Sequence, residues 1–391
     1  MTRDLSLVGY CTNVHAGADL DSTRASLERY ALAVKARIAP ERPMGIGLWL
    51  SANTARKLIA DNQVENFGLW LSEVGLVPYT FNGFPHGDFH QEVVKHRVYE
   101  PTWWEEARLQ YTLDLIQIQN ALLPAGMEGS ISTLPISWGQ PFPDFAQLGH
   151  SAWQLLQIAE HLEKLESSTG RLIYLCLEPE PGCVLQRVAD VVCFFQQYLF
   201  AKRDPEKIGR YLRVCHDICH AGVMFEPQAE VWDAYRKAGI RVGKVQVSAA
   251  VRAAWEELGL NDRPAAFRQL SEFNEKRYLH QTVTRQERQP ERFFEDLPPA
   301  LEQVTNPAGL RGEWRVHFHV PIYLERFGHL HSTQSDILEC LRVARDFPEM
   351  KHFEVETYAW NVLPAELQQP DLAAGIAEEM KWFLASQEKT G

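Results

Sequence analysis

Short apolar runs alternate with longer segments in which apolar residues recur every three or four positions. The short runs predict buried strands, and the longer segments predict amphipathic helices. The predicted strands are Leu5–Cys11, Gly45–Leu50, Leu76–Phe81, Ser130–Ile136, Leu172–Leu177, Leu212–Asp217, Gly243–Ser248 and Phe353–Tyr358. The predicted helices are Asp21–Ala36, Asn53–Val74, Pro101–Leu122, Phe145–Ser167, Leu185–Phe200 and Pro227–Lys237. This order predicts an α/β chain whose eight parallel strands close into a TIM (β/α)8 barrel.

The alternation breaks over residues 249–351, a stretch far longer than an ordinary connection between a strand and a helix. It contains an amphipathic segment, Pro264–Asn274, and two strand-like runs, Leu279–Thr284 and Arg315–Ile322. We interpret it as a long insertion before the last strand that lies over the mouth of the barrel, within a single domain of residues 1–391. An open doubly wound sheet would show the same alternation, but no Gly-x-Gly-x-x-Gly follows a predicted strand.

Composition narrows the classes of protein that remain. The 391 residues include 39 Lys and Arg against 51 Asp and Glu, which gives a net charge of −12, and 45% of the residues are hydrophobic. The hydrophobic content supplies a large core, and the acidic balance argues against a nucleic-acid partner. The longest apolar runs are strand-sized, so we expect no membrane insertion. The polar N-terminus and seven scattered cysteines predict a cytoplasmic protein with reduced thiols.

Charged side chains follow the fifth and sixth predicted strands. Glu178 and Glu180 come directly after the fifth strand, and Asp217 ends the sixth, with His220 three residues further on. In a TIM barrel the reacting groups lie at the carboxyl ends of the strands. A charge directly after a buried run is costly unless it is paired or bound to a metal ion. A solvated turn or a capping Asp would explain each residue singly, but together they indicate a functional site.

Polar side chains also occur in the seventh and eighth predicted strands. Gln246 lies within the seventh strand, where its amide oxygen suits a hard cation or simply satisfies backbone groups. Glu354 and Glu356 share one face of the eighth strand. Because helices cover the outside of a barrel, a central strand has no solvated face. We therefore expect an inward, functional glutamate on this strand.

Histidines are concentrated in the insertion. His317 and His319 alternate within an apolar run and so share a face, and His280 follows another apolar run. A His-x-His strand is a familiar zinc geometry when other ligands join it, although contact with a polar substrate is the interpretation we favour. Earlier strand ends carry further hydrogen-bonding side chains that we expect at the barrel mouth, namely Asn82, His86 and His15.

The strand-end pattern resembles the xylose-isomerase-like superfamily of sugar isomerases and epimerases. The metal site of that superfamily takes Glu, Asp, His or Gln, and Glu from successive late strands. The resemblance therefore implies that the metal ligands are Glu178, Asp217, Gln246 and Glu356. The Val-Gln246-Val segment is similar to the Gln-containing strand of hydroxypyruvate isomerases. His220, three residues after Asp217, matches a substrate-contacting His of ketose epimerases.

More narrowly, the whole chain resembles the EboE-type proteins, TIM barrels linked to metabolite traffic. The segments that support this likeness are Gly9–His15, Asn82–Gly87 and Glu354–Trp360, the last followed by Val362-Leu-Pro364. The resemblance implies a role in making or moving a small metabolite. The long insertion with its histidines departs from the plain epimerases and leaves the substrate range open.

The leading hypothesis is an isomerase or epimerase that transfers a proton at a carbon next to a carbonyl of a sugar-like metabolite. Glu178 and Glu356 would approach opposite faces of that carbon while a divalent ion holds the neighbouring oxygens. An all-oxygen shell suits Mn²⁺ or Mg²⁺, and Zn²⁺ would fit if His317 or His319 joined it. A metal-dependent phosphoester hydrolase and a non-catalytic metabolite carrier are the alternatives on the same fold. The expected partner is a small molecule, and oligomer formation is left open.

Overall fold

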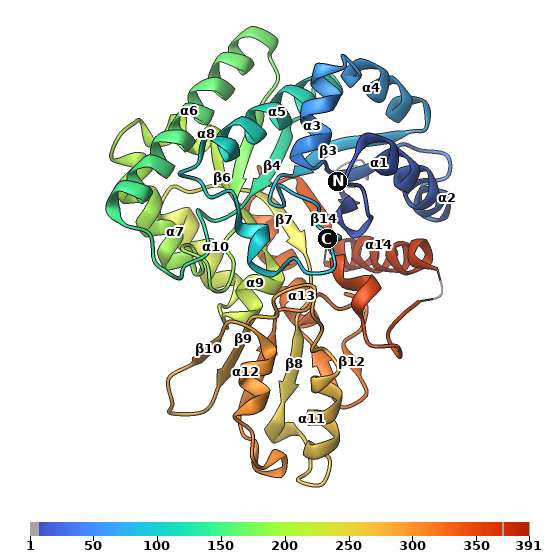
Figure 1. Ribbon diagram of the computed structural model, residues 1–391, viewed down its shortest axis with the longest axis vertical. Coiled ribbons are helices and arrows are strands. Elements are labelled where there is room, and N and C mark those ends of the chain that lie inside the picture. Colours follow the sequence, from blue (N-terminus) through green and yellow to red (C-terminus); the bar gives the residue numbers. More distant parts are fainter. Residues whose placement is uncertain (1–7, 370, 391) are drawn as a thin grey trace.

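Eight parallel strands form the central sheet of the computed structural model, which describes residues 8–369 and 371–390 (Figure 1). Their order is β1-β14-β7-β6-β5-β4-β3-β2, and a parallel bridge between Cys11 and Gly47 brings the first strand against the second. The predicted TIM (β/α)8 barrel is thereby confirmed. The strands are β1 (Val8–Tyr10), β2 (Met44–Trp49), β3 (Leu76–Asn82), β4 (Gly129–Thr133), β5 (Ile173–Leu177), β6 (Leu212–Asp217), β7 (Val242–Val247) and β14 (His352–Val355).

Each of the eight predicted strands overlaps one of these observed strands. The apolar runs locate them well because a barrel strand is buried on both faces, so its whole length is apolar. The start of the first prediction, Leu5–Leu7, lies outside the described residues, as does the polar N-terminus. All seven cysteines are free thiols, and Cys193 alone among them is exposed. Among the described residues, no helix combines the length and the apolar character needed to cross a bilayer.

Helices follow the strands and cover the outside of the barrel (Figure 1). They are α1 (Leu20–Ser26), α2 (Leu32–Ile38), α3 (Ala52–Ala60), α4 (Val64–Glu73), α5 (Glu106–Leu122), α6 (Phe145–Thr169), α7 (Val188–Phe194), α8 (Pro205–Tyr211), α9 (Ile218–Val223), α10 (Gln228–Lys237), α13 (Gln334–Val343) and α14 (Leu372–Thr390). The single helix predicted over Asn53–Val74 is two helices, α3 and α4. Asn62, between them, has a φ of 53°, a left-handed conformation that an α-helix cannot contain.

A second, antiparallel sheet is built from the residues between β7 and β14, and it forms the lower part of the molecule in Figure 1. Its strands, in the order β10-β9-β11-β8-β13-β12, are β8 (Val251–Ala254), β9 (Thr282–Arg285), β10 (Arg292–Phe294), β11 (Glu313–Val316), β12 (Arg326–Phe327) and β13 (Leu330–Ser332). Two helices accompany it, α11 (Arg263–Ser271) and α12 (Leu297–Glu302). The strand-like run predicted over Arg315–Ile322 is strand only as far as Val316. That the whole chain forms a single domain stays a prediction.

An ion pair lies inside the barrel. Lys244 Nζ on β7 is 2.5 Å from Glu354 Oε2 on β14, and both side chains are completely buried. A Cβ atom added to Gly47 on β2 would lie 1.1 Å from Glu354 Oε1, so only glycine leaves space for this carboxylate. Gln246 and Glu356 lie two residues further along the same two strands. Since side chains two apart point to the same face, the ion pair forms the layer directly beneath them.

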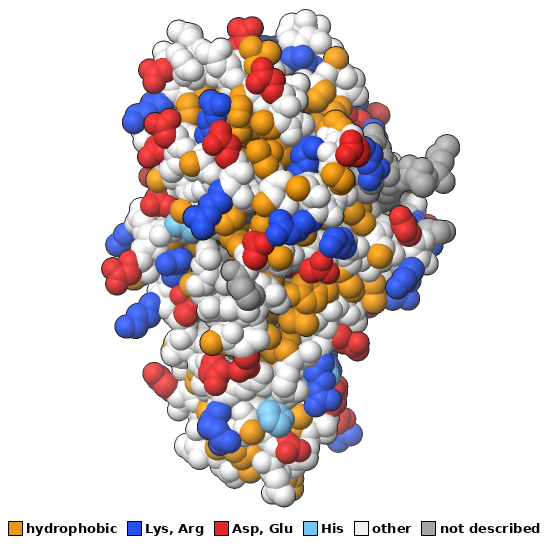
Figure 2. Space-filling model, turned by 90° about the vertical axis from the view of Figure 1, so that its right-hand side faces the viewer, with side chains coloured by type: hydrophobic (Ala, Val, Ile, Leu, Met, Phe, Trp, Pro, Cys, Tyr) orange, Lys and Arg blue, Asp and Glu red, His pale blue; other side chains and the backbone are white. Residues whose placement is uncertain are grey.

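The surface carries both signs of charge. On the face drawn in Figure 2, Lys and Arg side chains are intermixed with Asp and Glu side chains, and hydrophobic atoms gather between them. A protein that binds nucleic acid by its phosphates usually gathers Lys and Arg on one face. The mixed charge on this face is therefore consistent with the acidic overall balance of the chain.

Candidate functional site

Three carboxylates from three strand ends converge at the mouth of the barrel. Glu178 follows β5, Asp217 ends β6 and Glu356 follows β14, and their ligand oxygens all lie within 4.8 Å of one another. All three side chains are buried. We call this group the carboxylate floor. Negative charges so close together in a buried site repel strongly, so the group requires protons or a cation to be stable.

Two asparagines hold Glu356 in position. Its Oε1 accepts hydrogen bonds from Asn13 Nδ2 at 2.7 Å and from Asn82 Nδ2 at 3.0 Å. Asn13 lies just after β1, and Asn82 is the last residue of β3. Asn82, expected at the barrel mouth from the sequence, is thus found there against a floor carboxylate. Both amides bind the same oxygen, so neither contacts Glu356 Oε2.

Asp217 is held in a similar way, by one oxygen. Its Oδ1 accepts from Ser248 Oγ at 2.7 Å and from the backbone N–H of His220 at 2.9 Å. The second of these bonds caps the N-terminus of α9, which begins directly after β6. The sequence feature Asp-x-x-His therefore combines a helix cap with a site residue. Oδ2, the other oxygen of Asp217, remains available.

Several buried polar atoms at the site have no hydrogen-bond partner among the described residues. They are Glu178 Oε2, Asp217 Oδ2 and both amide atoms of Gln246. Gln246 is completely buried and pairs in register with Asp217 on one side and Glu354 on the other. Buried polar atoms without partners are rare in folded proteins, and each needs a cause. A bound cation is the cause that fits a set of oxygen atoms between neighbouring strand ends.

Burial changes the acidity of the floor. Burial raises the pKa of Glu178 to about 7, an effect that His220 partly opposes and Asp217 reinforces. Burial and the neighbouring carboxylates Glu178 and Asp217 raise the pKa of Glu356 well above its ordinary value. Burial also acts on Asp217, but the facing His220 and His319 and its two hydrogen bonds bring its pKa below the ordinary value overall. Without a cation, the floor therefore retains protons at neutral pH.

In two histidines that face the floor, the contacts show which ring nitrogen carries the hydrogen. His220 Nδ1 lies 2.8 Å from the carbonyl oxygen of Pro179, and His319 Nδ1 lies 2.6 Å from the carbonyl oxygen of Glu356. A carbonyl oxygen only accepts, so each Nδ1 carries the hydrogen and donates it. In the neutral ring Nε2 then has a free lone pair. Burial lowers the pKa of His319 to about 4, which keeps that ring neutral.

A third histidine, His317, belongs to a buried network. Its Nδ1 is 2.7 Å from Gln281 Oε1, and the amide nitrogen of Gln281 donates to Tyr99 Oη at 2.9 Å and to Glu180 Oε1 at 3.0 Å. Tyr99 Oη also donates to Glu180 Oε1, at 2.7 Å. These contacts fix the amide so that its oxygen accepts from His317 Nδ1. His317 Nε2 is buried without a partner among the described residues.

The histidines and carboxylates form overlapping groups. Ligand atoms of Glu180, His220 and His317 lie within 4.8 Å of one another, and so do those of Asp217, His220 and His319. The ring centroids of His220 and His317 are 4.6 Å apart. The carboxylate floor therefore continues into a nitrogen-rich side of the same cavity.

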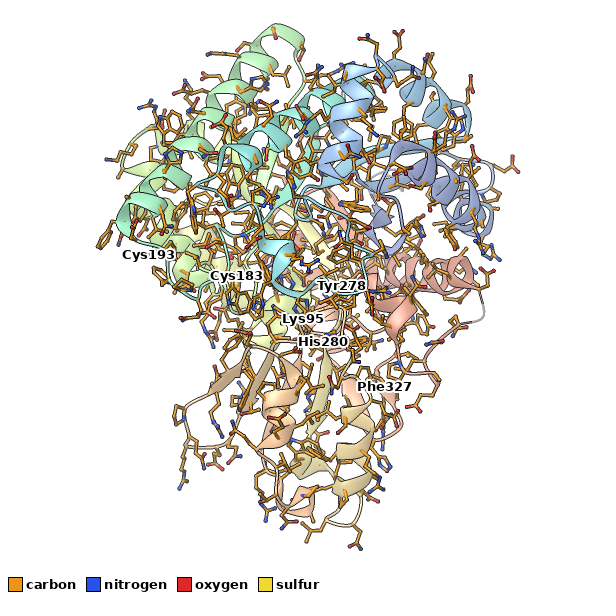
Figure 3. All side chains as sticks on the ribbon, viewed as in Figure 1. Lys95, Cys183, Cys193, Tyr278, His280 and Phe327 are labelled. Carbon is orange, nitrogen blue, oxygen red and sulfur yellow. The ribbon has the colours of Figure 1, made fainter. Side chains whose placement is uncertain are left out.

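The cavity lies between the barrel mouth and the second sheet, with a volume of about 540 Å³ including its opening. Glu178 and Glu356 line its inner end, while Asp217 lies buried beside them. The insertion supplies the opposite side, which we call the insertion wall and which consists of Tyr278, Leu279, His317 and His319. Figure 3 labels Tyr278, together with Lys95 and His280, at this junction.

The structure brings most of the predicted site residues together. Glu178, Glu356, Asn82, His220, His317 and His319 line the cavity, with Asp217 and Gln246 buried at its inner end. His317 and His319 lie beyond the end of β11, yet both still face the site, with ring centroids 5.2 Å apart.

Three predicted substrate contacts lie behind the cavity lining instead. His15 Nε2 is 2.9 Å from Tyr10 Oη, and its ring stacks on Tyr30. His86 packs edge-on against Tyr111. His280 is completely buried, with Nδ1 at 2.9 Å from the carbonyl oxygen of His317 and Nε2 at 2.8 Å from Glu275 Oε1. None of these three histidines is among the residues that line the cavity.

Other cavity residues were missed from the sequence. Glu180 was noted beside Glu178 after the fifth predicted strand but was given no role, and Asn13 lay within the segment Gly9–His15 without being singled out. Lys95 and Tyr99 lie on η4 (Lys95–Tyr99), a short turn of helix in the long connection from β3 to α5. Tyr358 begins the short helix η9 (Tyr358–Val362) after β14. Irregular segments such as these have no periodicity from which their contacts could be inferred.

Comparison with known proteins shows which fold the chain shares with solved structures, but it does not show a family. No protein-family model and no curated protein matches the chain. Among solved structures, a xylose isomerase-like TIM barrel protein from Mycobacterium smegmatis in complex with magnesium aligns with a TM-score of 0.53 and 12% identity, over 98% of this chain and 97% of that one. This likeness shows that the two chains share the TIM-barrel fold.

Two other solved structures align less closely. The 3-keto-D-glucoside 4-epimerase from E. coli has a TM-score of 0.37 and 17% identity, over 62% of this chain and 78% of its own. The IolI protein with a bound zinc atom has a TM-score of 0.47 and 10% identity, over 98% of this chain and 99% of its own.

Proposed function

We propose that this chain is a metal-dependent isomerase or epimerase that transfers a proton at a carbon next to a carbonyl in a small sugar-like metabolite. One observation carries the proposal: three buried carboxylates, Glu178, Asp217 and Glu356, have oxygens within 4.8 Å of one another at the mouth of a TIM barrel. Such a group has no structural purpose, because burying like charges together destabilises a fold. It suits a site that holds a cation and moves protons.

The residues present fit a divalent cation. Glu178, Asp217, Gln246 and Glu356 would hold it, and the unpartnered oxygens of Glu178, Asp217 and Gln246 support this assignment. Oxygen donors suit Mn²⁺ or Mg²⁺, and the similar fold from M. smegmatis is in complex with magnesium. His319, whose Nε2 is free, would favour Zn²⁺ if it joined the set. When bound, the ion supplies Lewis-acid polarisation of the substrate oxygens.

Glu178 and Glu356 are the groups that would carry protons. Asn13 and Asn82 hold Oε1 of Glu356, and neither of them contacts Oε2. Glu178 and Glu356 both line the cavity, so a carbon-bound proton of a substrate there would lie within reach of their carboxylates. A positioned carboxylate of this kind typically contributes about 10²–10⁴-fold to a rate.

The histidines would orient the substrate. His317 and His319 each direct an unprotonated Nε2 into the site, where it can accept a hydrogen bond from a substrate hydroxyl. A buried acceptor without a partner favours a ligand that supplies a donor over one that does not. The resemblance of the sequence to EboE-type proteins implies a role in making or moving a metabolite, and that role stays a prediction.

Phosphoester hydrolysis is the second candidate, favoured by one observation. The groups Glu180, His220, His317 and Asp217, His220, His319 would allow further ions beside the floor. Hydrolases of this kind need more than one ion to hold both the attacking and the leaving oxygen. The number of bound ions therefore separates this candidate from the isomerase.

Metal analysis followed by proton exchange tests the proposal. Protein purified without chelator should contain one Mn²⁺- or Mg²⁺-type ion, whereas two or three zinc ions would indicate the hydrolase and no ion would indicate a carrier. The metal-loaded protein should then exchange a carbon-bound proton of a hydroxycarbonyl compound for deuterium in heavy water, as followed by NMR. Absence of exchange across a panel of such compounds, with the metal bound, would refute the proposed reaction.

A further inference from the structure

The residues that line the cavity fall into two chemically different groups. The floor carboxylates Glu178 and Glu356, with Asn82 bonded to Glu356, form the group that we call the inner end. Apolar side chains from the β3–α5 connection and the insertion form the group that we call the outer end, among them Phe89, Val94, Val98 and Leu279. A polyhydroxylated chain needs hydrogen-bond partners along its whole length, so the outer end is the part that distinguishes substrates.

The hydroxyl groups of two tyrosines at the outer end are already bonded to the protein. Tyr99 Oη donates to Glu180 at 2.7 Å, and Tyr278 Oη donates to the carbonyl oxygen of Phe89 at 3.2 Å. The backbone N–H groups of Val94 and Lys95 donate to the carbonyl oxygen of Arg277, at 2.8 and 2.9 Å. These tyrosines therefore present ring surfaces to the cavity. A substrate hydroxyl placed here would lose its water partners without gaining new ones, which lowers affinity.

The outer end also offers no free positive charge from the described residues that line it. Lys95 is the single lysine or arginine among them, and its ammonium pairs with Asp296. Lys95 and Tyr278 both lie at the junction of the barrel and the second sheet (Figure 3). Phosphate recognition usually relies on unpaired Arg or Lys side chains. The carboxylates at the inner end would repel a phosphate further.

Aromatic rings form an ordered surface at this end. The ring centroid of Phe89 lies 4.9 Å from that of Tyr278 and 5.7 Å from that of Tyr358. Phe84 and Tyr99 form a second pair at 6.0 Å. Edge-to-face and tilted contacts of this kind extend readily to one more ring or to a branched alkyl group.

We propose that the substrate is an uncharged hydroxycarbonyl compound with an aromatic or branched alkyl group, so that only its hydroxycarbonyl head is sugar-like, and that it is neither a polyhydroxylated sugar nor a sugar phosphate. The polar head would lie on the carboxylate floor and the apolar group against Phe89, Val98 and Leu279. This inference rests on the proposed function, since the floor is what places the hydroxycarbonyl head. In exchange, a floor carboxylate takes the proton from the carbon next to the carbonyl, and a deuteron from heavy water replaces it.

Four probes test the inference on full-length protein loaded with Mn²⁺: α-hydroxyacetophenone, dihydroxyacetone, dihydroxyacetone phosphate and D-fructose. We expect kcat/KM for exchange to be about tenfold or more higher for the phenyl ketone than for any of the others, the scale on which a pocket discriminates one apolar group. Equal or faster exchange of a sugar or of the phosphate would overturn the inference while leaving the proposed function intact.

A matched pair of variants locates the preference. Val98→Thr keeps the volume of the side chain but adds a hydroxyl to the outer end, so it should lower the preference for the phenyl ketone several-fold. Val77→Thr is the control, because Val77 is half-buried near the start of β3, at the end away from the site. Equal ratios in Val98→Thr and the control would count against the outer end as the binding region.

Binding decides the inference if no probe exchanges, an outcome that counts against the proposed reaction. Saturation-transfer NMR on the same protein then compares the four probes directly. Binding of α-hydroxyacetophenone without binding of the sugars would support an apolar substrate. Preferential binding of a sugar or of the phosphate, or no binding of the phenyl ketone, would overturn it.

Discussion

The carboxylate floor and the insertion wall face each other across one cavity, and they present different unpartnered atoms to it. On the floor, Glu178 Oε2 and Asp217 Oδ2 are buried with no hydrogen-bond partner among the described residues. On the wall, the atoms without such a partner are His317 Nε2 and His319 Nε2, whose Nδ1 atoms are bonded to protein oxygens. Under the proposed function, the oxygens of the barrel would bind the cation and move protons, while the ring nitrogens and apolar side chains of the insertion would select the substrate.

The two regions also differ in how the chain builds them. The floor takes one residue from each of three strand ends, so a shift of any strand would disturb it. The wall comes from a single stretch between β7 and β14. A segment connected to the barrel at two adjacent strands can change its sequence without moving the strand ends. Substrate range should therefore vary with the wall more readily than the reaction varies with the floor.

The test with the largest expected effect substitutes one residue of each region, in two separate variants. Glu356→Gln should lower the turnover rate by about 10²–10⁴-fold, because the amide cannot carry the proton. The amide oxygen still accepts from Asn13 and Asn82, so the melting temperature should change little. His317→Gln should raise KM more than it lowers kcat, since it removes a substrate contact. Full exchange activity in Glu356→Gln would show that the floor does not perform the chemistry.

The support beneath the floor can be tested by stability. Lys244→Met leaves Glu354 buried without its partner, which should lower the free energy of unfolding by about 3–5 kcal/mol. Changing both residues, as Lys244→Met with Glu354→Leu, should recover much of the loss. Arg24→Ala, in an exposed pair with Glu28, is the control and should cost under about 1 kcal/mol. Urea unfolding gives all three values, and a loss as small as the control's would contradict a buried pair.

Glu379 connects the barrel to the insertion, and its ionisation should make the free energy of unfolding depend on pH. Glu379 on α14 accepts from Thr357 Oγ1 at 2.6 Å, Trp360 Nε1 at 3.0 Å and the N–H of Ile322 in the insertion at 3.1 Å. Burial raises its pKa from 4.5 to about 7. The folded state therefore keeps a proton that the unfolded chain has already lost above about pH 4.5.

The sign follows from that difference in proton binding. The contribution of Glu379 is complete below about pH 4.5 and decreases as the pH rises through about 7, by about 3 kcal/mol in total. Glu379→Gln stays neutral, so its free energy of unfolding should fall less than that of the natural chain between pH 5 and about 8. Parallel curves for the two proteins, measured by denaturant unfolding, would assign the pH dependence to other groups.

Metal binding gives the smallest of these effects and assigns the cation to one region. Mn²⁺ at a hundred times its dissociation constant should raise the free energy of unfolding by about 2.7 kcal/mol, and chelator should remove that gain. Asp217→Asn should lose the gain, whereas His317→Gln should keep it. Thermal unfolding with and without Mn²⁺ provides the measurement. The reverse result would move the cation from the floor to the wall.

Most of the fold could be predicted because barrel strands and their helices have distinct periodicities. The floor followed from the same pattern, since the ends of strands are where Glu178, Asp217 and Glu356 appear in the sequence. The break between α3 and α4 was missed because only the left-handed backbone of Asn62 marks it. Local apolar periodicity is unchanged on either side of that residue.

The wall was predicted only in part. His317 and His319 were placed on one face by their alternation, and both face the cavity although the strand has ended. His280, in contrast, does not line the cavity, and its ring Nε2 is hydrogen-bonded to Glu275. A sequence shows that a histidine follows an apolar run, but the partner of the ring depends on distant segments. The aromatic residues of the β3–α5 connection escaped notice for the same reason.

An isolated bridge, between Cys11 and Gly47, joins β1 to β2. We therefore expect the seam between these two strands to open more easily than the rest of the barrel. Asn13, which holds Glu356, follows this seam by two residues, and Thr12 Oγ1 accepts from the N–H of Trp49 across it. Transient opening there would loosen the hold of Asn13 on Glu356, the proposed catalytic carboxylate. Amide hydrogen exchange at Trp49, whose N–H crosses this seam, would thus measure how firmly Glu356 is held, and occupancy of the floor should slow it.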